Sequence, residues 1–116
     1  MTPFDATAAR EVFESSTDFT IGLEEEFALL DPDTLALRNA FEDLKAAADA
    51  DEVLAGSVAG ELIASEVEIR SGKGEHFADA LERQHERRRR LFALAEAQGL
   101  ALGATGTHPE GKDRCE

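Results

Sequence analysis

The sequence contains few residues of several types, and each shortage excludes a class of protein. Among its 116 residues there is one cysteine, Cys115, and there is no tyrosine or tryptophan. A single cysteine excludes an internal disulfide and is typical of a reducing compartment, so we expect a cytoplasmic protein. No apolar run reaches the roughly 20 residues of a membrane-spanning helix. Residues 1–16 also lack the apolar segment of a signal peptide, so we predict no membrane partner.

Basic residues are scarce too, at 12 against 25 acidic ones, which gives a formal net charge of −13. Residues 1–70 hold 17 acidic and 4 basic side chains, whereas residues 71–116 hold 8 of each. This balance argues against nucleic-acid binding through a general basic surface. It suits solubility, cations or basic partners. The length allows one domain, or a piece of a larger one.

The stretch 19–30 predicts a strand, because apolar residues alternate in it with small or polar ones. The apolar positions are Phe19, Ile21, Leu23, Phe27 and Leu29. Period-two alternation places Glu24 and Glu26 together on the opposite face, whereas Glu25 points with the apolar side chains. Two like charges one pleat apart weaken a strand unless a positive group lies over them. A divalent cation is one interpretation, and a solvated acidic face is the other.

The segment 61–70 predicts a second strand with the same pattern. Ile63, Ser65, Val67 and Ile69 form one face, and the other face includes Glu66 and Glu68. If both apolar faces pack on one layer, four carboxylates share one sheet face. Such a cluster needs cations or arginines opposite it.

Turn, capping and periodicity signals predict the remaining elements. They are helices at 5–14, about 39–50 and about 75–98, a turn at 31–34 with a short return strand at 35–38, a weakly structured connection at 51–60, and a third main strand at 100–105. Asp5 is the expected N-cap of the first helix, and Asn39 with Glu42 resembles a capping box for the second. Gly99 is the expected stop of the third. The fold class is therefore α+β.

Two further features allow more than one interpretation. The segment 83–90 is rich in arginine and is interpreted either as an anion-binding patch or as a solvated helix face with pairs such as Asp79 with Arg83 and Glu86 with Arg90. His108 follows the third strand, where imidazole can bind a metal or a phosphate, or can cap a loop. No base accompanies Cys115, and no residue is assigned a catalytic role.

Three motifs together resemble a known family. They are Thr20-Ile21-Gly22-Leu23-Glu24-Glu25-Glu26-Phe27, Ser65-Glu66-Val67-Glu68-Ile69 and Gly106-Thr107-His108-Pro109. In this order and spacing they resemble the start of the carboxylate–amine ligases of the glutamate–cysteine ligase type 2 group. The resemblance covers residues 19–109, which would be part of the ligase catalytic domain, preceded by an extension at 1–18 and followed by a polar tail at 110–116.

The resemblance implies the N-terminal portion of a glutamine-synthetase-like antiparallel sheet with flanking helices. It implies an ATP- and Mg²⁺-dependent enzyme that activates the γ-carboxylate of glutamate as an acyl phosphate, which cysteine or another amine then attacks. Glu24, Glu26 and Glu68 fall on positions of metal-binding acids, and Glu24, Glu26 and His108 on nucleotide-binding positions. Mg²⁺ would neutralise charge during phosphoryl transfer.

The sequence also departs from the family pattern. Glu66 stands where many relatives have an uncharged residue, so it is not counted as a ligand, and Glu110 stands where an apolar residue is usual. Members of the family continue far beyond this length, so we expect a truncated fragment that is inactive alone and that self-associates through an open sheet edge. The alternative is a non-catalytic acidic α+β module that binds a cation or a protein.

Overall fold

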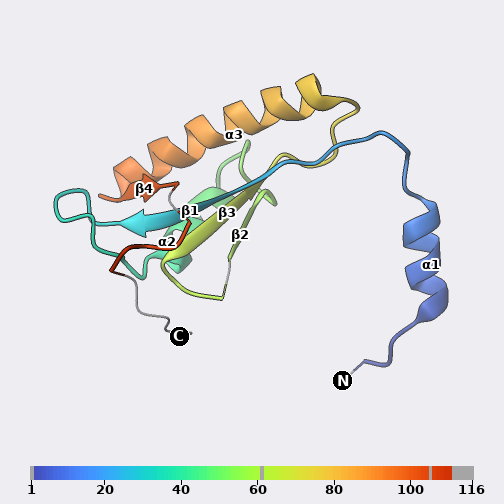
Figure 1. The fold of residues 1–116 in the computed structure, drawn as a ribbon, viewed down its shortest axis with the longest axis horizontal. Helices are drawn as coiled ribbons and strands as arrows, with labels where there is room; N and C mark the ends of the chain where they lie inside the picture. The colour runs from blue at the N-terminus through green and yellow to red at the C-terminus, as the bar shows by residue number, and fades with distance from the viewer. Residues whose placement is uncertain (1, 61, 105, 111–116) are drawn as a thin grey trace.

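The computed structural model describes residues 2–60, 62–104 and 106–110. Its elements are α1 (Ala6–Glu14), β1 (Glu24–Leu30), α2 (Phe41–Asp49), β2 (Val58–Gly60), β3 (Glu66–Arg70), α3 (Phe77–Ala97) and β4 (Ala101–Gly103). The strands form an antiparallel sheet in the order β2-β3-β1-β4, with α2 and α3 packed beside it (Figure 1). The predicted α+β class is confirmed. Within the described ranges, no helix has both the length and the apolar character needed to cross a membrane.

The two acidic strands, β1 and β3, are direct neighbours in the sheet. Glu26 lies opposite Glu68, and Phe27 lies opposite Val67. Cross-strand partners point to the same side of a sheet, so the apolar side chains of both strands share one face and the carboxylates share the other. The predicted alternation is confirmed for the residues that lie within these two strands.

Helices α2 and α3 both cover the apolar face. Leu44 of α2 and Leu91 of α3 are fully buried and belong to one core cluster with Leu29, Val67 and Ile69 of the sheet. Burying each such side chain stabilises the fold by about 1.5–3 kcal/mol relative to leaving it in water. Because both helices lie on this face, neither of them covers the carboxylates on the other face.

Glu25 is the one charged residue of β1 that points with the core, as predicted. Two side chains of α3 accommodate it: Gln84 Nε2 donates to its Oε1 at 3.2 Å, and Arg88 Nε lies 3.7 Å from its Oε2. Gln84 is itself buried, and its own Oε1 has no partner among the described residues. The half-buried carboxylate of Glu25 therefore ties β1 to α3.

Helix α1 confirms the predicted helix at 5–14 and its cap. The side chain of Asp5 accepts hydrogen bonds from the backbone N–H groups of Thr7 and Ala8, both at 3.0 Å. No residue of α1 is buried, and the helix stands apart from the sheet at the end of an extended segment (Figure 1). Helix α1 therefore contributes nothing to the core cluster; that residues 1–18 form a separate extension stays a prediction.

The first strand is shorter than predicted. It begins at Glu24 rather than at residue 19, and Phe19 has a left-handed φ of 66° and is 93% exposed. The physical reason is the lack of a continuous partner: β3 ends at Arg70, and Gly72, with φ 72°, turns the chain away. Before Glu24 the pairing continues as one hydrogen bond from the N–H of Ser71 to the carbonyl of Leu23 at 2.9 Å and an isolated bridge between Ile21 and Gly74.

The second strand also begins late, at Glu66. Leu62 is 81% exposed, and residues 62–65 form bends and turns rather than strand, so the predicted start at 61 is wrong; residue 61 itself lies outside the described ranges. The N–H of Phe41 binds the carbonyl of Ala64 at 3.1 Å, which holds this segment against the start of α2.

Three predictions on loops and caps need correction. The N-cap of α2 is Ala40, without a side-chain hydrogen bond, so the capping box at Asn39 is wrong. The return strand at 35–38 is reduced to one bridge between Leu30 and Leu37. The connection at 51–60 contains β2, whose three residues are too few to show a period.

The end of the chain follows its prediction more closely. Helix α3 lies within the predicted range 75–98 and is followed by Gly99 with φ 71°, the left-handed conformation typical of a helix stop. The third strand covers Ala101–Gly103 of the predicted 100–105. Thr105, Cys115 and most of the predicted tail lie outside the described residues.

Candidate functional site

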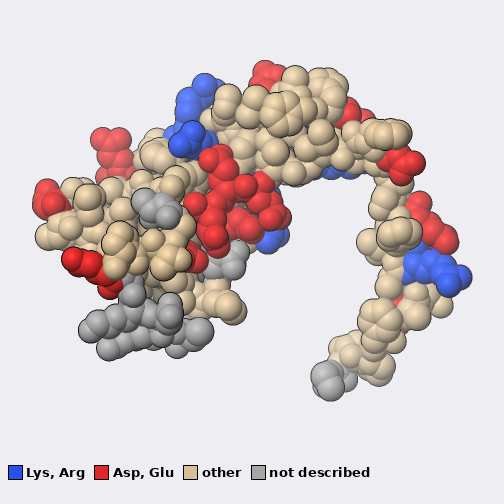
Figure 2. Space-filling view, viewed as in Figure 1, with Lys and Arg blue, Asp and Glu red and all other residues tan. Residues whose placement is uncertain are grey.

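The candidate site is the sheet face opposite the helices, which we call the carboxylate face. It consists of Glu24 and Glu26 on β1 and of Glu66, Glu68 and Arg70 on β3. Glu26 lies opposite Glu68, and Glu24 lies opposite Arg70. Figure 2 shows acidic side chains gathered over the region of these two strands. The four predicted carboxylates therefore do share a face, and the sheet brings an arginine among them.

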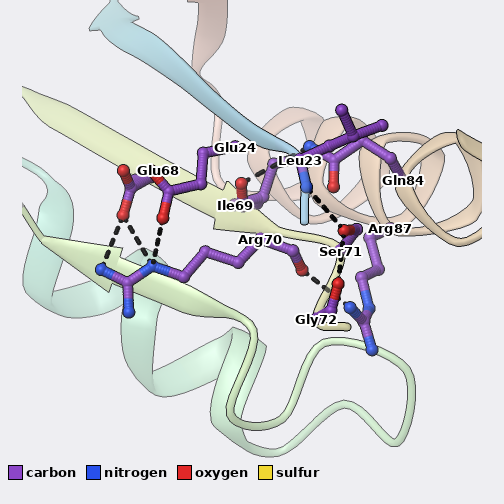
Figure 3. Close-up of polar contacts among 9 residues, drawn as sticks. All are labelled: Leu23, Glu24, Glu68, Ile69, Arg70, Ser71, Gly72, Gln84 and Arg87. Carbon is purple, nitrogen blue, oxygen red and sulfur yellow. Dashed lines mark hydrogen bonds and ion pairs between the residues drawn. The ribbon is translucent and has the colours of Figure 1, made fainter. Parts of the chain in front are cut away.

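Among the residues that the structure describes, Arg70 is a cation that lies against two of these acids, Glu24 and Glu68. Its Nε and Nη2 both lie 2.8 Å from Oε2 of Glu68, and its Nε lies 3.6 Å from Oε1 of Glu24 (Figure 3). The expected need for a cation or an arginine is met here by an arginine. Period-two alternation already puts residue 70 on the same face as residue 68. The sequence alone could therefore have indicated Arg70 as a partner of Glu68.

The two acids that bind Arg70 differ in exposure. The side chain of Glu68 is 11% exposed, whereas that of Glu24 is 62% exposed. An exposed ion pair contributes little, because water screens it. A buried carboxylate pays a desolvation cost and needs a close partner. The contact between Arg70 and Glu68 is therefore the stronger of the two.

Hydrogen bonds fix the backbone at the end of β3 where Arg70 lies. Arg87 of α3 donates to the carbonyl of Arg70 at 2.7 Å (Figure 3). Ser71, fully buried, accepts from the N–H of Leu23 at 2.9 Å and donates to the carbonyl of Gly72 at 2.7 Å. These bonds position the backbone of Arg70 and the start of β1 relative to α3.

All three motifs meet at a small cavity beside Glu26. Its volume is about 190 Å³, and it is lined by Glu26, Phe27, Ala28, Glu66, Gly106 and Thr107. Pockets for small molecules usually measure at least about 300 Å³, so this cavity has the size of an ion or a phosphate group rather than of a whole nucleotide. A wider hollow of about 320 Å³ lies at the other end of the face and is lined by Gly22, Leu23, Glu24, Arg70 and Gly72.

His108 holds a loop in this structure. Its Nε2 lies 2.8 Å from the carbonyl oxygen of Leu35, and its Nδ1 accepts from the N–H of Glu110 at 3.0 Å. These partners assign the ring proton to Nε2. Both ring nitrogens are thus engaged by backbone groups, as in the loop-capping interpretation. A role of His108 toward a nucleotide stays a prediction.

The carboxylate face fits a hard divalent cation in the chemistry of its donors. Carboxylate oxygens are ligands that Mg²⁺ takes, generally one or two, with water and phosphate oxygens completing the shell. Within the described ranges, no three His, Cys, Asp or Glu side chains are already arranged to hold a metal ion. The metal role of Glu24, Glu26 and Glu68 stays a prediction.

The arginines of the segment 83–90 in α3 mostly make contacts within the protein. Arg83 pairs with Asp79 at 3.3 Å, as predicted from their spacing. Arg90 binds Asp51 at 2.6 Å, a partner far away in the sequence. This hydrogen bond lowers the pKa of Asp51 and raises the pKa of Arg90. These contacts favour the solvated-face interpretation over an anion-binding patch.

The fold and site together define an α+β domain whose antiparallel sheet has helices on one face and carboxylates on the other. A family model described as glutamate-cysteine ligase family 2 (GCS2) matches residues 20–116. The match covers most of the chain, so the chain belongs to this family, and the family resemblance of the three motifs is confirmed.

Curated relatives agree with this assignment. A Rubrobacter xylanophilus protein named "Putative glutamate--cysteine ligase 2-3" is 39% identical over 97 residues, which are 84% of this chain and 26% of that protein. Proteins named "Putative glutamate--cysteine ligase 2" from Sorangium cellulosum and Bordetella avium are 36% and 35% identical over 78% and 84% of this chain. The chain spans about a quarter of the length of these relatives. No solved structure matches the chain significantly.

Proposed function

We propose that this chain forms one wall of the Mg²⁺–ATP site of a carboxylate–amine ligase that joins glutamate to cysteine in the cytoplasm. The observation that carries the proposal is the pairing of Glu26 with Glu68 across β1 and β3, next to a cavity lined by Gly106 and Thr107. Three motifs that are distant in the sequence meet there, and all three belong to the family resemblance. The sheet would be the opening part of a glutamine-synthetase-like catalytic domain.

The residues of the carboxylate face have distinct proposed roles. Glu24, Glu26 and Glu68 would hold Mg²⁺ through carboxylate oxygens. Glu24 and Glu26, together with His108 outside this face, would contact the nucleotide. When bound, Mg²⁺ supplies positive charge that neutralises the phosphate oxygens. The backbone of Gly106 and Thr107 lies beside Glu26, where small residues permit close approach of a phosphate.

The proposed reaction has two steps. A γ-carboxylate oxygen of glutamate attacks the terminal phosphorus of ATP, so that the P–O bond to ADP breaks and an acyl phosphate forms. The amine of cysteine, or of another amine substrate, then attacks the acyl carbon. Inorganic phosphate leaves, the amine loses a proton, and an amide bond remains.

The test measures ADP and amide product formed by the complete gene product that contains this sequence. We expect both products only when ATP, Mg²⁺, glutamate and an amine are present together, and we expect cysteine to be the best amine. The 116-residue chain alone should release no ADP, because its relatives are about four times as long. Replacing the substrate cysteine by free alanine or glycine in the assay then defines which amine the enzyme uses.

Two outcomes contradict the proposal. ADP release by the complete gene product that needs neither glutamate nor an amine would indicate a different ATP-dependent reaction. Absence of ADP with every amine, under conditions in which the protein is folded and binds Mg²⁺, would favour the non-catalytic cation-binding module.

A further inference from the structure

We infer that Arg70 is the resident counter-ion of the carboxylate face, and that a divalent cation binds Glu68 by displacing Arg70. The inference rests on the proposed function, because it concerns the same cation site. It makes Arg70 a positioning residue that sets how tightly the face binds a cation. Nothing in the motifs that define the family resemblance includes residue 70.

Arg70 occupies the position that a cation would take. Two of its nitrogens lie 2.8 Å from one oxygen, Oε2 of Glu68, and its Nε also approaches Glu24 at 3.6 Å. These two acids are proposed metal ligands. The two N–H donors already occupy this oxygen, and a dication bound beside the guanidinium would repel it, so a metal ion and Arg70 compete for Glu68.

The burial of Glu68 makes this competition strong. Its side chain is 11% exposed, and Glu26 lies directly opposite it on β1. A buried carboxylate facing a second carboxylate needs a positive partner. Removing Arg70 leaves that need unmet in the apo protein. A divalent cation then gains the full attraction without first breaking two charge-assisted hydrogen bonds.

The exchange requires movement of a side chain and not of the strand. The backbone of Arg70 is fixed on both sides, because its N–H binds the carbonyl of Ser57 at 2.9 Å and its carbonyl accepts from Arg87 at 2.7 Å. The side chain is 53% exposed and borders the hollow of about 320 Å³ beside Glu24. The guanidinium can therefore rotate outward into solvent while β3 stays in place.

The experiment measures Mn²⁺ binding, as a paramagnetic substitute for Mg²⁺, to the 116-residue chain by the EPR signal of free Mn²⁺. We expect Arg70→Gln to bind Mn²⁺ about tenfold more tightly than the unmodified chain, because two charge-assisted contacts no longer compete. Arg70→Lys should give a smaller gain, since lysine keeps the charge but lacks the planar fork. Circular dichroism confirms that each variant is folded.

Two further variants make the result specific. Arg83→Gln is the matched control, because it removes an arginine of similar exposure, 48%, that is paired with Asp79 away from the carboxylate face. It should bind Mn²⁺ like the unmodified chain, which separates local competition from a change in net charge. Adding Glu68→Gln to Arg70→Gln should abolish the gain.

Each outcome decides the inference. Equal or weaker Mn²⁺ binding by Arg70→Gln overturns it, as does an equal gain in Arg83→Gln or the absence of Mn²⁺ binding in every variant. Failure of the proposed function is distinguishable from these results. If the complete gene product has no ligase activity but Arg70→Gln still binds Mn²⁺ more tightly, the reaction is wrong and the role of Arg70 stands.

Discussion

Among single residues, Glu68 has the environment most relevant to the candidate site. It is a nearly buried carboxylate that lies opposite another carboxylate and binds one arginine. Replacing such an arrangement by apolar side chains is often neutral or stabilising, so folding alone gives no reason to keep it. A cation site gives a reason, because the buried charges are then available to bind a ligand.

A second buried acid, Asp51, permits a prediction on pH. Its side chain is 7% exposed, it binds Arg90 at 2.6 Å, and it accepts from the N–H groups of Val53 and Leu54. These bonds lower the pKa of Asp51 in the folded protein. Its contribution to stability is therefore fully present above the unfolded pKa of about 3.9 and is lost as the pH falls through the lower folded value.

We expect Asp51→Asn to lower the free energy of unfolding at about pH 7 and to have a much smaller effect at about pH 2. Urea unfolding at both pH values measures the difference. Asp33→Asn, at an exposed position, is the control and should change stability little at either pH. An effect of Asp51→Asn that is equally large at both pH values would mean that its ionisation does not stabilise the fold.

At the scale of elements, periodicity predicted the faces better than the ends. The alternation in β1 and β3 was predicted because the pleat imposes it on every residue. The ends were missed because they depend on partners: β1 has no continuous partner before Glu24, since Gly72 turns the chain after β3. The short strand β2 and the cap at Ala40 carry no signal in the sequence that periodicity or side-chain capping detects.

The junction between β3 and α3 depends on a glycine, Gly74. A Cβ added at Gly74 would lie 2.8 Å from the backbone nitrogen of Ala80 and 2.7 Å from its Cβ. The helix backbone cannot yield to this contact. We expect Gly74→Ala to destabilise the protein by about 1–3 kcal/mol, the usual cost of overpacking, as measured by denaturant unfolding.

Gly22→Ala is the matched control for this substitution, because its Cβ would meet only the carbonyl oxygen of Gly72 at an ordinary 3.7 Å. Its effect should be small. If Gly74→Ala is as stable as Gly22→Ala, the start of α3 has more freedom to move than the close contact with Gly74 implies.

At the scale of the whole molecule, charge and shape are divided among distinct regions. The helices α2 and α3 and the sheet form one core, while α1 stands apart (Figure 1). Val12 and Phe13 on α1 and Phe4 before it are exposed. The sequence predicted the carboxylate face because β1 and β3 both alternate with a period of two residues and both carry motifs of the family resemblance. It did not show that Arg70 also approaches Glu24, because that contact appears only when β1 and β3 are paired in register.

The central claim is that the carboxylate face serves ligase chemistry, and one comparison tests it most directly. The rate of ADP formation by the complete gene product, with glutamate and cysteine present, is measured for Glu26→Gln and for Glu11→Gln. Both substitutions remove one negative charge, but Glu11 lies on α1, where no residue is buried, away from the carboxylate face. We predict that Glu26→Gln lowers the rate about 100-fold or more, as expected for a metal ligand, and that Glu11→Gln lowers it less than about threefold. Near-normal turnover by Glu26→Gln would contradict the account.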